Sequence, residues 1–251
     1  MRILITNDDG LEASQLPALA AWCQKLGQVT VVVPKFEQSG KSHSFEIRRP
    51  FEAKQVDLIP GVEVWVVDST PADCVRLAVL GLKMKFDLCV SGINRGFNMG
   101  RDIMYSGTVG AAAEAVNLGI PAVAVSTSPE NYPRATEELD RVLAFFREHR
   151  LLDRGSLYNV NIPPEPKGIR ITRQGGPYYS DLFPAIGGGL YKPTGIPVWQ
   201  DSGDDTLDTD ATLHGCITIT PLTIDRTDNA LFRHLRAEIS EITEAYSYEN
   251  H

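Results

Sequence analysis

The chain has 251 residues, of which 43% are hydrophobic and 22% charged. This globular composition excludes disordered and fibrous classes, and the length allows a core that needs no disulfide or structural metal. The 32 acidic and 24 basic residues give a formal charge of −8, which excludes a broad face for a nucleic-acid duplex and leaves small anionic ligands open.

The first half of the chain alternates short apolar runs with helical stretches. Gly27 and Gly119 follow two of the helical stretches as stop signals, and Thr70-Pro71 is a typical helix start. Continuous apolar strands separated by helices indicate a parallel sheet covered on both faces, a doubly wound, Rossmann-like α/β fold. Strands are expected at 2–6, 29–33, 62–67, 86–90 and 122–125, and helices at 14–26, 70–82, 106–118 and 132–150.

The pattern changes after residue 156. A strand is expected at 158–162, and the Gly-, Pro- and aromatic-rich residues 168–224 favour short strands and a hairpin, with a strand at 216–220. A terminal helix is expected at 229–246, with an apolar stripe of Leu231, Leu235, Ile239 and Ile242. We expect a single domain, with a Rossmann-like core over 1–165 and a β-rich extension plus terminal helix over 166–251. The acidic run 201–210 lacks the glycine and glutamate of an EF-hand loop, so we interpret it as a solvated loop.

The four cysteines, Cys23, Cys74, Cys89 and Cys216, are far apart and lie in apolar stretches. Zinc ribbons and thioredoxin-like sites are therefore disfavoured, and we expect four small buried hydrophobes. The apolar run at 3–5 ends at Asn7, so no secretory signal is expected, and no run approaches the roughly 20 residues of a membrane span. A cytoplasmic protein without a membrane partner is the expectation.

Ligands of open α/β sheets bind outside the carboxyl ends of the strands, so catalytic and ligand-binding residues are expected in the loops that follow the strands. Asp8 and Asp9 follow the first strand, and two adjacent carboxylates repel each other unless a cation lies between them. They suggest Mg²⁺, Mn²⁺ or Ca²⁺, with Ser39 and Asn94 available from neighbouring loops. The alternative is a capped turn without a metal, because Asn-Asp-Asp-Gly is also good turn chemistry.

A second candidate is the helix start at Ser106-Gly107-Thr108, whose free backbone N–H groups suit phosphate. An ordinary serine or threonine cap is the alternative. The sequence contains no P-loop, no strand-linked GxGxxG and no GxSxG elbow, so nucleoside-triphosphate, dinucleotide and α/β-hydrolase sites are disfavoured. His43 is the one histidine near these loops.

Taken together, these stretches resemble the SurE (stationary-phase survival) family of metal-dependent 5′/3′-nucleotidases. The resemblance runs in order over nearly the whole chain. It is carried by ILITNDDG at 3–10, QSG with Ser42 and Ser44, TPADCV at 70–75, SGINRG at 91–96, Asn98-x-Gly100-x-Asp102, YSGTVGAA at 105–112, NVNIP at 159–163, DTD at 208–210 and ITPL at 219–222.

The resemblance implies one divalent cation per subunit, Mg²⁺ or Mn²⁺, held by Asp8, Asp9, Ser39 and Asn94. It also implies a phosphate pocket formed by Asn98, Ser106, Gly107 and Thr108. Homodimers or homotetramers are implied as well, in which the terminal helix and a long hairpin are exchanged between subunits.

The expected activity is hydrolysis of nucleoside 5′-monophosphates, with 3′-monophosphates also open, and with Asp8 and Asp9 as the catalytic carboxylates. Two alternatives stay open: a broader phosphatase or exopolyphosphatase, and a non-catalytic nucleotide-binding regulator. Lys41 departs from the small residue usual in the family, and Lys41 and His43 are candidate substrate contacts at the pocket mouth.

Overall fold

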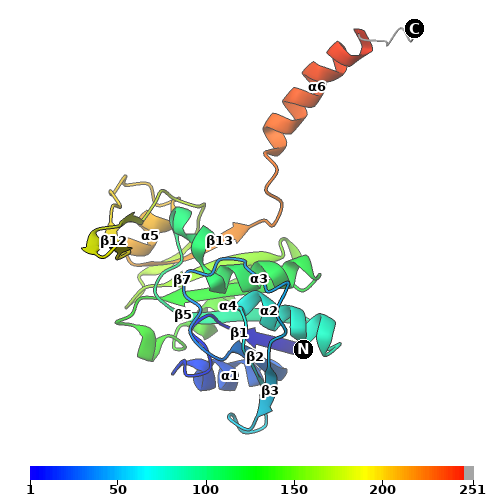
Figure 1. Ribbon diagram of the computed structural model, residues 1–251, viewed down its shortest axis with the longest axis vertical. Helices are drawn as coiled ribbons and strands as arrows, with labels where there is room; N and C mark the ends of the chain where they lie inside the picture. Colours follow the sequence, from blue (N-terminus) through cyan, green and yellow to red (C-terminus); the bar gives the residue numbers. More distant parts are fainter. Residues whose placement is uncertain (246–251) are drawn as a thin grey trace.

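Nine strands form one central sheet with helices on both faces (Figure 1). The computed structural model describes residues 1–245. The sheet has the order β3-β4-β2-β1-β5-β6-β7-β13-β8. Its strands are β1 Arg2–Thr6, β2 Gln28–Pro34, β3 Ala53–Val56, β4 Glu63–Val67, β5 Leu88–Arg95, β6 Ala122–Thr127, β7 Leu157–Ile162, β8 Gly168–Ile171 and β13 Cys216–Leu222.

The direction of winding reverses between β1 and β5. From β1 the chain proceeds to β2 and β4 on one side, and from β5 to β6 and β7 on the other, all in parallel pairs. β3 adds an antiparallel edge, and β13 pairs antiparallel with β7. The predicted doubly wound sheet is therefore confirmed, and its switch point lies between β1 and β5, where such folds bind ligands.

Alternate strand residues pack into two apolar layers. On one face Ile3 and Ile5 pack with α1 and α4, and on the other Leu4 packs with α2 and α3. The helices are α1 Leu16–Gln24, α2 Pro71–Arg76, α3 Gly107–Asn117, α4 Leu139–Glu148, α5 Asp208–Leu213 and α6 Asn229–Ala245. Cys23, Cys74, Cys89 and Cys216 are free and buried, as the sequence predicts.

Two expected boundaries were wrong. The helix expected at 132–150 is divided into a 3₁₀ turn at Tyr132–Arg134 and α4 at Leu139–Glu148, with turn residues between them. The strand expected at 86–90 runs on as β5 to Arg95, so Ser91 and Asn94 lie within a strand rather than in the loop we expected.

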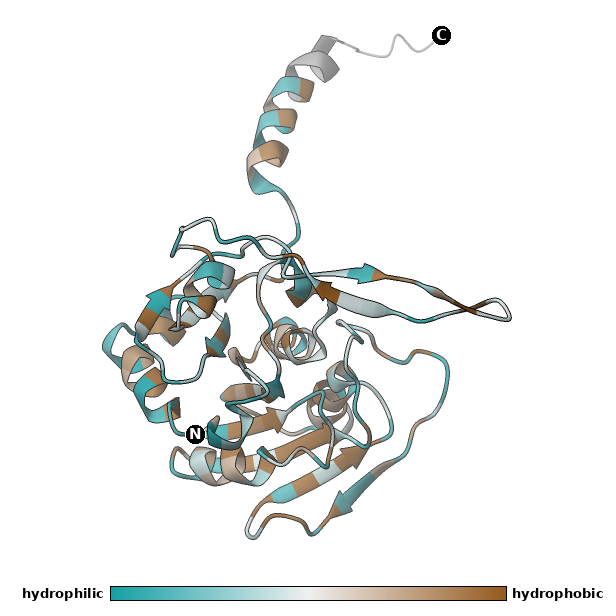
Figure 2. Ribbon diagram, turned by 90° about the vertical axis from the view of Figure 1, so that its left-hand side faces the viewer, coloured by the Kyte–Doolittle hydropathy of each residue, from teal (hydrophilic) through white to brown (hydrophobic). Residues whose placement is uncertain are grey.

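The second half contains the expected short strands, and it also contains a helix, α5, that we did not expect. The short strands are β9 Tyr179–Leu182, β10 Ala185–Gly187, β11 Leu190–Tyr191 and β12 Thr194–Pro197, paired as β9 with β12 and β10 with β11. They form an arm that projects from the body (Figure 2).

Helix α6 stands away from the rest of the molecule (Figure 1). It confirms the predicted terminal helix as far as Ala245, whereas Tyr246 and the side chain of Ile242 lie outside the described residues. In the described part of the chain, no helix has the length and apolar character needed to cross a membrane.

Candidate functional site

Asp8 and Asp9 lie at the switch point, directly after β1. The Asn7 side chain shapes their turn, because its amide donates to the Gly10 carbonyl at 3.0 Å and its oxygen accepts from the Gly10 N–H at 3.1 Å. The structure thus contains both the capped turn and the carboxylate pair, and the turn directs Asp8 toward α3. The Asp8 side chain is 4% exposed.

The Asp8 carboxylate faces the first turn of α3. The Thr108 hydroxyl donates to Asp8 Oδ1 at 2.5 Å. A Cβ at Gly107 would lie 2.9 Å from the Asp8 Cβ, so glycine allows this close approach. Burial raises the pKa of Asp8, and hydrogen bonds from Thr108 and from the Gly107 N–H lower it in part. The Asp8 carboxylate therefore shares this helix N-terminus with the phosphate pocket that the sequence predicts at Ser106, Gly107 and Thr108.

Asp9 is half-buried beside Asp8 and has little compensating positive charge. Burial, the Asp8 carboxylate and the Glu37 carboxylate raise the pKa of Asp9 to about 6, although the Arg95 N–H donates to its Oδ2 at 3.3 Å. Like charges held this closely favour a cation between them. We did not expect Glu37 near the pair, and the one signal in the sequence is its place two residues before Ser39.

Ser39 lies in the loop after β2 and Asn94 lies in β5, and β2 and β5 are the two strands that flank β1. The Gln38 N–H donates to the Asp8 carbonyl at 2.7 Å, which holds the loop after β2 against the turn. In this structure the Ser39 hydroxyl donates to Glu37 at 2.6 Å rather than to either aspartate. The Asn94 amide donates to the Gly96 carbonyl at 2.8 Å, which commits its nitrogen.

The four candidate metal ligands fit a hard divalent cation. They offer carboxylate, hydroxyl and amide oxygens, which Mg²⁺ and Mn²⁺ prefer. The described residues contain no group of three or more His, Cys, Asp or Glu side chains that could hold a metal. The shell of Asp8, Asp9, Ser39 and Asn94 has only two such side chains, and it stays a prediction.

Asn98 is buried and tightly held. Its carbonyl accepts from the Asn159 and Asn161 amides at 2.7 and 2.8 Å, and its N–H donates to Asn161 Oδ1 at 2.9 Å. Its own amide donates to the Ser126 hydroxyl at 2.8 Å. We expected Asn98 but had no role for Asn159 and Asn161, although both alternate with apolar residues in NVNIP.

The loop that carries Asn98 is anchored by α5. Both Asp208 carboxylate oxygens accept from the Gly100 N–H, at 3.0 and 3.1 Å, and Oδ1 also accepts from the Gly175 N–H at 2.8 Å. Burial raises the pKa of Asp208, and these hydrogen bonds lower it in part. The Gln174 amide donates to the Gly100 carbonyl at 2.9 Å.

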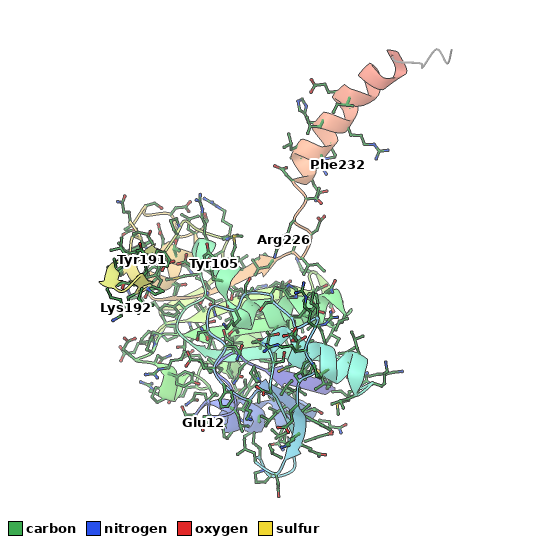
Figure 3. The ribbon with its side chains drawn as sticks, in the orientation of Figure 1. Glu12, Tyr105, Tyr191, Lys192, Arg226 and Phe232 are labelled. Carbon is green, nitrogen blue, oxygen red and sulfur yellow. The ribbon has the colours of Figure 1, made fainter. Side chains whose placement is uncertain are left out.

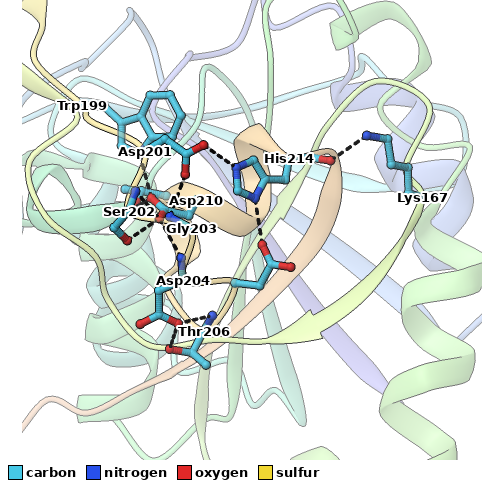
Figure 4. Close-up of polar contacts among 11 residues, drawn as sticks. Lys167, Trp199, Asp201, Ser202, Gly203, Asp204, Thr206, Asp210 and His214 are labelled. Carbon is cyan, nitrogen blue, oxygen red and sulfur yellow. Dashed lines mark hydrogen bonds and ion pairs between the residues drawn. The ribbon is translucent and has the colours of Figure 1, made fainter.

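The acidic run 201–210 was wrongly interpreted as a solvated loop in its last part. Asp208 and Asp210 are 0% and 1% exposed. Asp210 accepts from the Trp199 indole N–H at 2.8 Å and the Ser202 hydroxyl at 2.6 Å (Figure 4). The exposed Asp201 and Asp205 of this run both contact the ring of His214, at 3.1 and 2.8 Å. Spacing alone cannot reveal the partners of Asp208, because its donors, the N–H groups of Gly100 and Gly175, come from distant segments.

Ser106 is the N-cap of α3, and its hydroxyl accepts from the Val109 N–H at 3.1 Å. The serine cap that we gave as the alternative is therefore present, and the phosphate pocket stays a prediction. Lys41 is exposed, whereas the His43 ring lies 2.7 Å from the carboxylate of Glu114, a residue of α3. Glu114 also binds Arg76 at 2.8 Å. His43 therefore ties the loop that bears Ser39 to α3, and its role as a substrate contact stays a prediction.

This fold and this site define a Rossmann-like α/β protein in which a carboxylate pair and a helix N-terminus meet at the switch point of the sheet. Such a site suits a divalent cation and an anionic ligand.

The chain belongs to the SurE family: the family described as Survival protein SurE matches residues 3–181. The 5′-nucleotidase SurE of Carboxydothermus hydrogenoformans is 40% identical over 262 residues, covering 96% of this chain and 97% of that protein. The 5′-nucleotidase SurE of Pelotomaculum thermopropionicum is 38% identical over 245 residues, covering 94% of each. A crystal structure of the SurE protein from Aquifex aeolicus has a TM-score of 0.74 and 32% identity, over 95% of this chain and all of that one.

Proposed function

We propose that this chain is a metal-dependent phosphomonoesterase that hydrolyses nucleoside 5′-monophosphates, and 3′-monophosphates as secondary substrates, to nucleoside and phosphate. The observation that carries the proposal is the Asp8–Asp9 pair at the switch point, with Asp8 facing the first turn of α3. The relatives named 5′-nucleotidase SurE support the same activity, because they match this chain over nearly its full length.

In this proposal Asp8, Asp9, Ser39 and Asn94 hold one Mg²⁺ or Mn²⁺ per subunit. When bound, the cation supplies charge neutralisation at the phosphoryl oxygens and lowers the pKa of a water. A carboxylate of the Asp8–Asp9 pair accepts the proton that the attacking water loses. Thr108 keeps Asp8 oriented, because its hydroxyl donates to Oδ1.

The phosphoryl group lies against the start of α3. Ser106 and the N–H groups of Gly107 and Thr108 stabilise charge on its equatorial oxygens, with Asn98 beside them. The loop containing Asn98 is held by buried amides and by Asp208, so the pocket needs little reorganisation when charge develops.

Two assays test this function. Release of phosphate from AMP should stop in excess chelator and return with Mg²⁺ or Mn²⁺, and Zn²⁺ should restore it poorly because the shell has no Cys or His ligand. Asp8→Asn should abolish turnover in a folded protein. The matched control is Asp57→Asn, an exposed carboxylate beyond the end of β3 on the opposite edge of the sheet. Full activity in chelator, or in Asp8→Asn, would disprove the mechanism.

The alternative functions predict different activities on a panel of substrates. A broad phosphatase or exopolyphosphatase would release phosphate from short polyphosphate chains as fast as from AMP. A non-catalytic regulator would bind AMP without turnover under every metal tested. We favour the enzyme because a protein that only binds nucleotides has no need of a complete oxygen-donor shell around adjacent carboxylates.

We also propose that residues 166–251 form the surface of a homodimer or homotetramer. Exposed apolar side chains gather on the arm and on α6, where Figure 3 labels Tyr191 and Phe232. Leu231, Leu235 and Ile239 of the predicted stripe are 50%, 42% and 49% exposed. An exposed stripe of this kind is normally covered by a partner. Light scattering on a chain truncated before Asn229 should show a smaller or aggregating species, and an unchanged oligomer would contradict the proposal.

A further inference from the structure

A cavity of about 370 Å³ opens beside the candidate site, between residues 44–52 and the segment that follows β4. Asp68, Ser69 and Thr70 line it from the carboxyl end of β4, and Gln38 lines it from the loop after β2. Neither the metal shell nor the phosphate residues proposed above form part of its lining. Its place at the carboxyl edge of the sheet is where ligands of this fold lie.

The cavity is at the right separation to receive the part of a nucleotide that lies beyond its phosphate. β4 pairs with β2, and β2 pairs with β1, so the end of β4 lies two strand spacings from Asp8, about 10 Å. This distance is comparable to the length of a nucleoside. Gln38 joins the two places directly, because it lines the cavity and its N–H donates to the Asp8 carbonyl at 2.7 Å.

On the other side of Asp8, toward β6 and β7, protein residues cover the carboxyl ends of the strands. Beyond β5, the loop that carries Asn98 covers the ends of β6 and β7 and is bonded to Ser126, Asn159 and Asn161. A second cavity, about 930 Å³, begins at Ser106 and His43, which line it, and runs along α3 toward Arg226, away from the end of β4. A Cβ at Gly110 would lie 2.5 Å from the Ser42 carbonyl oxygen, which shows how closely that loop contacts the helix.

Within the smaller cavity, one carboxylate is left without a partner. Glu46 accepts from three backbone N–H groups, and Glu52 pairs with Lys54 at 2.8 Å. Among the described residues, the Asp68 side chain has neither a hydrogen bond nor an ion pair, although its backbone N–H donates to Glu52. A free carboxylate can accept one hydrogen bond on each oxygen, which matches the two hydroxyls of a ribose.

Two aromatic rings complete the lining. Phe51 is half-buried and packs on the apolar layer beneath α2 and α3, so its position is fixed. Phe45 is 47% exposed, and the Arg76 guanidinium lies 4.6 Å from its ring centroid. Aromatic faces of this kind stack on nucleobases with little preference among the bases.

We propose that this cavity is the nucleoside subsite, in which the Asp68 carboxylate accepts hydrogen bonds from the ribose 2′- and 3′-hydroxyls and Phe45 and Phe51 form the wall for the base. The proposal rests on the nucleotidase function proposed above. It makes Asp68 the residue that distinguishes ribonucleotides from phosphate esters without a ribose, and it assigns base stacking to residues that tolerate any base.

The test compares Asp68→Asn with the parent enzyme on four substrates, in Mg²⁺ or Mn²⁺. A hydrogen bond to a charged acceptor corresponds to a factor of about 10 to 100, so kcat/KM should fall by that factor for AMP and ribose 5-phosphate. It should stay within about twofold of the parent value for 2′,3′-dideoxyadenosine monophosphate and p-nitrophenyl phosphate. Asp57→Asn should change none of the four values.

Phe45→Leu separates the base from the ribose. It should lower kcat/KM for AMP by about fivefold or more and leave ribose 5-phosphate unchanged, because stacking contributes about 1–3 kcal/mol per base. If Asp68→Asn lowers kcat/KM equally for AMP and the dideoxy analogue, or does not lower it for AMP, the subsite is wrong. Turnover of p-nitrophenyl phosphate by the same variant would still support the phosphatase function. A parent enzyme inactive on all four substrates would overturn the proposed function and the subsite with it.

Discussion

Replacing Asp208 by alanine tests whether the extension stabilises the candidate site. The substitution leaves the buried N–H group of Gly100 and the half-buried N–H group of Gly175 without their acceptor. Each orphaned buried donor costs about 1–3 kcal/mol, and part of that loss is offset because the carboxylate no longer has to be buried. We therefore expect the free energy of unfolding to fall by about 2–4 kcal/mol. In a chain of this size the melting temperature should fall by about 5–12 °C.

Urea unfolding followed by circular dichroism measures this loss, and steady-state kinetics on AMP measures its effect on the site. The KM for AMP should rise, because Gly100 lies two residues after Asn98 in the anchored loop. Asp208→Asn keeps one acceptor oxygen and should lose about half as much. Asp205→Ala is the matched control, an exposed aspartate whose contact with His214 contributes little. An unfolding midpoint for Asp208→Ala equal to that of the control would refute the anchoring argument.

Three further predictions concern single side chains. Asp9→Asn should stop hydrolysis of AMP, yet the metal-free variant should be at least as stable as the metal-free parent, because the substitution removes repulsion with Asp8. Scanning fluorimetry in chelator measures this, and a melting temperature below that of the parent would contradict the prediction. Burial alone would raise the pKa of Asp210, but hydrogen bonds from Ser202 and Trp199 lower it to about 2, so its contribution to stability is present above pH 4 and is lost toward pH 2. The stability difference between the parent and Asp210→Asn should accordingly vanish on acidification, and a constant difference would contradict the assignment. Lys41→Ala should raise the KM for AMP at low salt only, and an unchanged KM at low salt would leave Lys41 without a role in substrate capture.

The central fold could be predicted because its local signals agree with one another. Thr70 caps α2 by accepting from the Asp73 N–H at 3.1 Å, with Pro71 next, as the dipeptide predicts. Placing Asp8, Asp9, Ser39 and Asn94 at one edge required only the order of the strands and the rule that their carboxyl ends meet there. No tertiary contact had to be known for either inference.

The rest could not be predicted, because it depends on partners that are distant in the chain. Asp208 looks like part of any exposed acidic run until the backbone of residues 100 and 175 is brought against it. β5 continues past Val90 because β6 supplies partners for Asn94 and Arg95 beyond a register shift. The position of the His43 ring is likewise set by Glu114, which lies 71 residues away in the chain.

The position of the site follows from where the apolar layer ends. Thr6, Ser91 and Asn159 occupy one row across the sheet, since Thr6 pairs with Ser91 and both Ser91 and Asn159 pair with Ala124. All three are fully buried, and each has a side-chain oxygen without a partner within the described structure. Neighbouring strands thus change from apolar to polar side chains at this row, beneath the small residues of α3. Because this row and Asp8 are buried, water is largely excluded beneath the turn, and the charges on Asp8 and Asp9 interact strongly with any cation or phosphate that binds.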